Sequence, residues 1–193
     1  MAKSMFLVLD MINDLIHEDG PNGKKGYGPI LARRNIIANT AIAIAKARAA
    51  GVPIGYVRVG FSPDYREVAT NSGVFNGAKK AELFKLGSWG TQVHPALAPH
   101  PEDYDIIKHR VSPFYATTLD PILGANQITH LVLCGVSTTG AVLSAAKDGH
   151  DRDYDITILD DCSAAITDEH HKVTLDMVSR FATITTAADI VFA

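Results

Sequence analysis

The chain has 193 residues, 47% of them hydrophobic and 20% charged, which is typical of a globular protein with one sizeable core and excludes a disordered or fibrous chain. A net charge of -3 gives no electrostatic reason to bind nucleic acid or an anionic membrane. The first hydrophobic run, Met5–Leu9, is too short for a signal peptide or a membrane span, and two cysteines cannot form a disulfide framework. We therefore expect a cytoplasmic protein with a single domain over residues 1–193.

Six hydrophobic runs along the chain predict β-strands, and helical segments separate most of them. Strands that alternate with helices are typical of a parallel sheet joined by crossover helices. The order predicts a three-layer α/β/α sandwich, Rossmann-like, with a mainly parallel six-stranded sheet. The predicted strands are Ser4–Leu9, Ile54–Val59, Asp105–Lys108, His130–Gly135, Ile156–Asp160 and Thr183–Thr185.

The clearest helix is predicted over Pro29–Ala50, where isoleucines recur near helical spacing. Pro29 suits the first helical turn, and Gly51 follows the predicted end. Thr167 is a predicted N-cap for the last helix of the chain. The later helices are predicted over Leu119–Gly124, Thr139–Gly149 and Thr167–Phe181.

A long stretch, Gly60–Pro101, has no clear period and predicts an excursion over the sheet. Loops of that length are usually functional or mobile. Its aromatic residues Phe61 and Trp89, with Phe114 and Tyr115 after the third predicted strand, are candidate apolar walls of a substrate pocket. The alternative is that these four are ordinary core or interface aromatics.

Two charged residues end predicted strands. Asp10 follows the first strand and Lys108 closes the third. Open parallel sheets bind ligands at the carboxyl ends of their strands, so this pair is a candidate catalytic site. Asp10 could instead cap the following turn, and Lys108 alone could be a surface lysine at the sheet edge.

The segment Gly135–Ala141 leads from a strand into a helix through small residues. Free amides there suit an oxyanion or a carboxylate, although tight packing of the helix on the sheet explains the small residues equally well. The histidines lack the spacing of a zinc site, and the nucleotide-binding glycine motifs are missing. We therefore expect neither a metal nor a cofactor.

Taken together, the motifs resemble those of the isochorismatase-like, or cysteine hydrolase, superfamily. They are Leu-Asp-Met-Ile-Asn-Asp around Asp10, Ile-Ile-Lys-His-Arg around Lys108, Leu-Cys-Gly-Val-Ser-Thr entering a helix, and the segment from Asp153 to Ala164. The resemblance covers about Ser4 to Thr186. It implies a three-layer sandwich, commonly assembled as a homodimer or homotetramer.

The resemblance also implies a set of site residues. Amidohydrolases of this family use an Asp, a Lys and a Cys, which correspond here to Asp10, Lys108 and the position of Ala141. Backbone amides at Ser137 and Ala141 would form the oxyanion hole, beside a cis Val136–Ser137 peptide. Because a methyl group cannot attack a carbonyl, the two-step cysteine route is closed to this chain.

Other branches of the family fit less well. Isochorismatases proper also lack the cysteine and cleave a vinyl ether, with the Asp as acid, but carry an aromatic residue and a His where this chain has Ser137–Thr139. The zinc-binding acid and histidines of the nicotinamidase branch are missing around Arg58–Tyr65.

The sequence therefore predicts a hydrolase that acts on a small carbonyl, amide or vinyl-ether substrate, with Asp10 as acid or base and Lys108 positioning charge. One alternative is a noncatalytic homologue that binds a small molecule. Another is a cysteine amidohydrolase whose nucleophile was replaced by Ala141.

Overall fold

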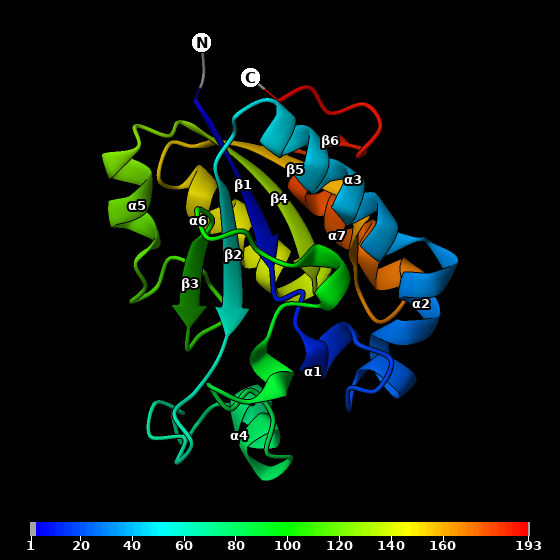
Figure 1. The fold of residues 1–193 in the computed structure, drawn as a ribbon, viewed down its shortest axis with the longest axis vertical. Helices are drawn as coiled ribbons and strands as arrows, with labels where there is room; N and C mark the ends of the chain where they lie inside the picture. The colour runs from blue at the N-terminus through cyan, green and yellow to red at the C-terminus, as the bar shows by residue number, and fades with distance from the viewer. Residues whose placement is uncertain (1–2, 193) are drawn as a thin grey trace.

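The computed structural model of the protein describes residues 3–192 and is built around one six-stranded sheet in which every strand pairs in parallel (Figure 1). This confirms the predicted sheet. From one edge to the other the strands are β3 (Tyr104–Lys108), β2 (Ile54–Val59), β1 (Ser4–Leu9), β4 (His130–Val136), β5 (Asp155–Ala164) and β6 (Thr183–Thr185).

Helices cover both faces of the sheet, as the three-layer prediction requires. Alternate residues of β1 point to opposite faces, so Phe6 and Val8 pack in one hydrophobic cluster while Leu7 and Leu9 pack in the other. The α-helices are α1 (Asn13–Ile16), α2 (Gly28–Arg33), α3 (Ile36–Ala49), α4 (Gly73–Lys80), α5 (Leu119–Ala125), α6 (Leu143–His150) and α7 (Asp168–Val178). The short helical turns are η1 (Gly23–Tyr27), η2 (Trp89–Thr91), η3 (Pro95–Leu97) and η4 (Thr138–Val142).

The helix predicted over Pro29–Ala50 is wrong as a single element. The structure has two helices, α2 and α3, because Asn35 adopts a left-handed conformation with φ 54° between them. Asn is among the residues that tolerate this region best, and here it turns the chain so that Arg34 points toward β5. Gly51, with φ 69°, follows the end of α3 as predicted.

The bounds of the remaining strands and helices lie close to the predicted ones, except at the end of β5. β1, β2 and β6 match their predicted limits, and Thr167 caps α7 by accepting a hydrogen bond from the amide of His170. β5 was expected to end at Asp160 but continues to Ala164. The two aspartates at Asp160 and Asp161 do not end the strand, because each accepts hydrogen bonds from other segments.

The excursion after β2 is folded rather than irregular. It carries α4 and the turns η2 and η3, and it is tied to the segment that follows β1. The amide of Phe84 donates to Asp14 at 2.7 Å, and the side chain of Asn13 donates to the carbonyl of Trp89 at 3.0 Å. Ile12 and Val93 form an isolated antiparallel bridge. The long segment is therefore fastened beside the carboxyl end of β1, where Figure 1 shows α1 and α4.

None of the helices in the described part of the chain combines the length and the apolar character needed to cross a lipid bilayer.

Candidate active site

Asp10 and Lys108 meet at the carboxyl edge of the sheet, although β2 separates their strands. The Lys108 ammonium lies 2.7 Å from one Asp10 carboxylate oxygen, and the amide of Val59, at the end of β2, donates to the other at 2.7 Å. The ammonium also donates to the carbonyl of Arg110 at 3.2 Å. Asp10 and Lys108 are 5% and 2% exposed, so the charges of this ion pair are almost completely withdrawn from water.

The turn after β4 lies next to Asp10, because Leu9 at the end of β1 pairs with Gly135. The Val136–Ser137 peptide is cis, as the family resemblance implies. Ser137 follows this bond, and Ala141 lies in η4 with 4% of its surface exposed. The structure thus brings Ser137 and Ala141 to the same edge as Asp10 and Lys108.

Tyr27 is a site residue that the sequence did not reveal. It ends η1, is 8% exposed, and its hydroxyl lies near the side chain of Ser137. Burial raises the pKa of its hydroxyl; Ser137 acts to lower this pKa, and the negative charge of Asp10 to raise it, with a net upward shift. A phenol kept protonated beside Ser137 and Asp10 is a hydrogen-bond donor aimed at this edge. Ser137 lies more than a hundred residues away along the chain, and no local motif marks its proximity to Tyr27.

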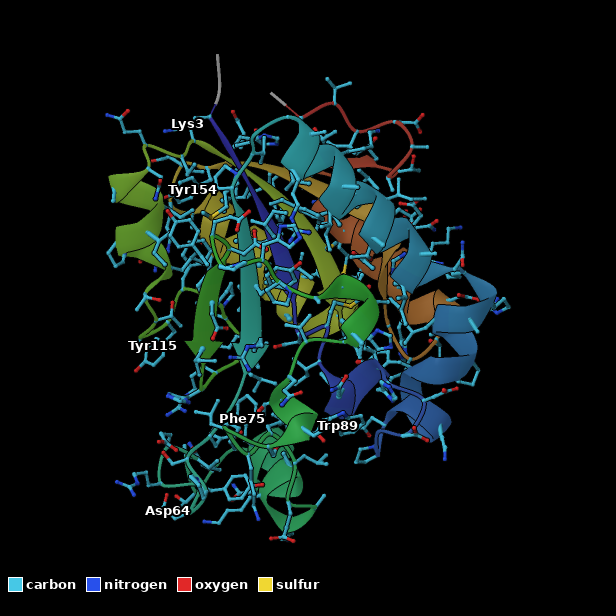
Figure 2. All side chains as sticks on the ribbon, viewed as in Figure 1. Lys3, Asp64, Phe75, Trp89, Tyr115 and Tyr154 are labelled. Atoms are coloured by element: carbon cyan, nitrogen blue, oxygen red, sulfur yellow. The ribbon has the colours of Figure 1, made fainter. Side chains whose placement is uncertain are left out.

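The two aromatic candidates of the excursion differ in their surroundings. Phe61 is fully buried and packs edge-on against Phe75, with their ring centroids 5.2 Å apart. Trp89 is 44% exposed and lies beside α1 (Figure 2), 4.9 Å from the ring of His17. Phe61 therefore belongs to the small hydrophobic cluster of the excursion, whereas Trp89 has a free face near the segment that follows Asp10.

Phe114 and Tyr115 lie away from the other candidates. Phe114 stacks on Tyr154, lies under the guanidinium of Arg152, and reaches Gly149 in the last turn of α6, whereas Ala141 lies in η4, before the start of α6. Figure 2 shows Tyr154 toward the amino end of β1 and Tyr115 on the outer side, near β3. Tyr115 is 62% exposed. The structure does not bring these two rings to Asp10 and Lys108.

Neither cysteine takes the place of the missing nucleophile. Cys134 lies inside β4 and Cys162 inside β5, and both are fully buried. Burial raises the pKa of both thiols well above the usual value. Thiolates are the nucleophilic form of cysteine, so these two side chains are inert.

A series of polar side chains in contact with one another links the turn after β4 to α7 and β5. Thr138 contacts His171 of α7, and His171 contacts Asp160 of β5, which pairs with Arg34. The hydrogen bond from His171, with the charge of Arg34, holds the pKa of Asp160 below its usual range. The sequence marked the Asp160 region as a strand end but gave no sign of its partners.

This lowered pKa predicts acid sensitivity. The unfolded chain binds a proton at Asp160 more readily than the folded protein, so the stabilisation is present above the ordinary carboxyl pKa and is lost as the pH falls through the lower folded value. We expect the free energy of unfolding to fall less steeply between about pH 5 and about pH 2 in Asp160→Asn than in the unchanged protein. Urea titrations across that range measure this, with the exposed Asp151→Asn as control. Equal slopes for all three proteins would contradict it.

Cavity size alone does not locate this site. A cavity of about 920 Å³ opens between α1, α2, α3 and η3, with mostly apolar walls that include His17 and His94. Asp10 and Lys108 do not line it. Within residues 3–192 no cluster of three or more His, Cys, Asp or Glu side chains has the arrangement of a metal site. The buried ion pair of Asp10 and Lys108 therefore remains the candidate active site.

Comparison with known proteins places the chain in a family. Residues 4–189 match the isochorismatase domain, so the chain belongs to the isochorismatase family. The ureidoacrylate amidohydrolase RutB of Methylobacterium radiotolerans is 31% identical over 198 aligned residues, which cover 93% of this chain and 74% of that protein.

Solved structures agree with this assignment. The N-carbamoylsarcosine amidase of Thermoplasma acidophilum is 29% identical, with a TM-score of 0.79 over 97% of this chain and 98% of that one. A cysteine hydrolase of Pseudomonas syringae pv. phaseolicola, at 22% identity, shares the fold with a TM-score of 0.86 over 97% and 90% of the two chains. The family is one of hydrolases, and the names of the Methylobacterium and Thermoplasma relatives refer to amide hydrolysis.

Proposed function

We propose that this chain hydrolyses a small carboxamide or ureido compound, with Asp10 as acid and base on water and Lys108 as the group that positions charge. The observation that carries the proposal is the buried ion pair of Asp10 and Lys108 beside the turn of Ser137 and Ala141. Withdrawing two charges from water costs several kcal/mol per ion, and a pair of apolar residues would pack here at lower cost. A catalytic role explains why the charges are kept.

The relatives narrow the substrate class. A ureidoacrylate amidohydrolase and an N-carbamoylsarcosine amidase are both named for compounds with a carbamoyl group on nitrogen. In such a compound the planar carbonyl carbon is bonded to nitrogen, and a nitrogen atom is the leaving group when the bond is hydrolysed. We extend this substrate class to the present chain, in preference to a vinyl ether.

Because position 141 holds alanine, the proposed reaction has no acyl-enzyme. A water molecule attacks the carbonyl carbon while Asp10 accepts its proton. The carbonyl oxygen takes the negative charge next to the amides of Ser137 and Ala141, with Tyr27 as a further donor. Asp10 then returns the proton to the leaving nitrogen as the carbon–nitrogen bond breaks. Lys108 holds the carboxylate in place through both steps.

Ammonia release from N-carbamoyl amino acids and simple carboxamides tests the proposal. We expect slow turnover by the unchanged protein and a loss of about 100-fold or more in Asp10→Asn, since a positioned acid–base group contributes at least that much. Asp105→Asn is the matched control, because Asp105 on β3 has an exposed carboxylate that pairs with Arg58 of β2. Mass spectrometry of the quenched reaction should show no covalent adduct on the unchanged protein.

Ala141→Cys distinguishes the remaining possibilities. If turnover and an acyl adduct appear only in this variant, the site is that of a cysteine amidohydrolase whose nucleophile position holds alanine, and the water mechanism is wrong. If the unchanged protein binds an N-carbamoyl amino acid without releasing product, and the variant does the same, the chain is a binding homologue. Either result would overturn the proposal.

A further inference from the structure

A line of four side chains, Thr138, His171, Asp160 and Arg34, runs from the catalytic turn toward the surface, and we call it the relay. The hydroxyl of Thr138 lies 2.7 Å from Nδ1 of His171. Nε2 of His171 lies 2.8 Å from a carboxylate oxygen of Asp160, and the guanidinium of Arg34 contacts the same oxygen at 2.5 Å. The relay joins η4, α7, β5 and the link between α2 and α3.

The charges of the relay decide which way its hydrogen bonds point. The hydrogen bond from His171, with the charge of Arg34, keeps the pKa of Asp160 low, so this carboxylate is ionised and can only accept. Nε2 of His171 therefore carries a proton. In the neutral ring Nδ1 is then an acceptor, and Thr138 donates its hydroxyl proton to it. Asp160 thus determines the tautomer of His171, and His171 determines the orientation of the Thr138 side chain.

Thr138 is placed where its orientation matters for the site. It is the first residue of η4, between Ser137 and Ala141, and it is fully buried. Water cannot replace its partner, so losing the contact leaves an unsatisfied hydroxyl. Tyr27 lies near Ser137, and the relay contacts the next residue of the turn, Thr138.

We propose that His171 is a positioning residue, which acts through Thr138 to hold residues 137–142 in the geometry that presents the Ser137 and Ala141 amides beside Asp10. For catalysis this inference rests on the proposed function. The geometry itself is independent of turnover, because the position of the turn sets the environment of any side chain at position 141.

The test uses a thiol as a probe of the turn. In Ala141→Cys the new thiol lies in the first helical turn, where aligned amides lower the pKa of a thiol. The rate of alkylation by iodoacetamide, followed against pH, reports that pKa. The two natural cysteines are buried with raised thiol pKa values, and the unchanged protein provides the blank.

In this background we expect Thr138→Val and His171→Ala to raise the midpoint of the alkylation profile by about one pH unit, which is about a tenfold slower reaction near neutral pH. Thr138→Ser keeps the hydroxyl and should restore the parent profile. Thr174→Val is the matched control: it also removes a buried hydroxyl from its bond, here to the carbonyl of His170 on α7, but lies outside the relay.

A merely structural relay would give a different result. If Thr138→Val and His171→Ala lower the melting temperature but leave the alkylation profile of the parent unchanged, or if Thr174→Val shifts it equally, the inference is wrong. Ammonia release is measured on the same proteins without the thiol. Absence of turnover there contradicts the proposed function alone, whereas a normal kcat in Thr138→Val contradicts the relay alone.

Discussion

Lys108→Met is expected to lower the free energy of unfolding by about 3–5 kcal/mol, because it leaves the Asp10 carboxylate buried without its cationic partner. Asp10 is 5% exposed, and among residues 3–192 the amide of Val59 is the donor that its carboxylate keeps. Methionine fills a similar volume, so the loss reflects charge rather than a cavity. Equilibrium unfolding in urea measures the change.

The double variant Asp10→Asn, Lys108→Met provides the critical comparison. Once both charges are gone the desolvation cost is also gone, so we expect it to recover a large part of the loss. As an exposed control, Arg33→Met removes the partner of Asp168, whose side chain is 49% exposed, and should cost less than about 1 kcal/mol. If Lys108→Met lowered the free energy of unfolding as little as Arg33→Met does, burial of the unpaired Asp10 carboxylate would not carry the expected cost.

Gly135→Ala is expected to be the most damaging glycine substitution near the site. Gly135 has φ 128°, and a Cβ built there lies 2.0 Å from the carbonyl oxygen of Leu9. Gly135 on β4 and Leu9 on β1 lie in neighbouring central strands. Because the overlapped atom is a backbone oxygen, moving a flexible side chain cannot relieve the overlap. Backbone strain and overpacking together should cost at least about 3 kcal/mol.

Gly77→Ala is the matched control for Gly135→Ala. It lies inside α4 with open space around the added methyl group, and alanine there should stabilise the helix by about 0.5–1 kcal/mol. Urea unfolding of the two variants should therefore move in opposite directions. A Gly135→Ala protein as stable as the parent would mean that β1 and β4 separate easily at this point.

The sheet could be predicted because each strand is marked by residues that are close together in the sequence. Each central strand is a short hydrophobic run with a break at its end, and parallel pairing follows from the helices between strands. The extension of β5 to Ala164 escaped prediction, because Asp160 and Asp161 look like a strand end until their distant partners are known. The break at Asn35 escaped for a similar reason, since helical periodicity continues across it.

The site could be predicted only where strand ends indicate it. Asp10 and Lys108 each end a strand, and the rule for parallel sheets places both at one edge, where they do form an ion pair. Their catalytic roles stay predictions. Tyr27 and His171 reach Ser137 and Thr138 from helices whose sequences carry no sign of the contact. Phe114 was proposed from its place after a strand, yet its ring turns toward α6.

The ties between the excursion and the segment after β1 have a consequence for how substrate gains access. Asn13 and Asp14 follow Asp10 closely in the chain, and they hold the carbonyl of Trp89 and the amide of Phe84. A lid on a free hinge opens without disturbing the reacting groups. Here an outward swing of the excursion around residues 84–93 pulls on the backbone that leads from Asp10. If Asp10 has the proposed acid–base role, an opening of this kind would therefore also move its carboxylate.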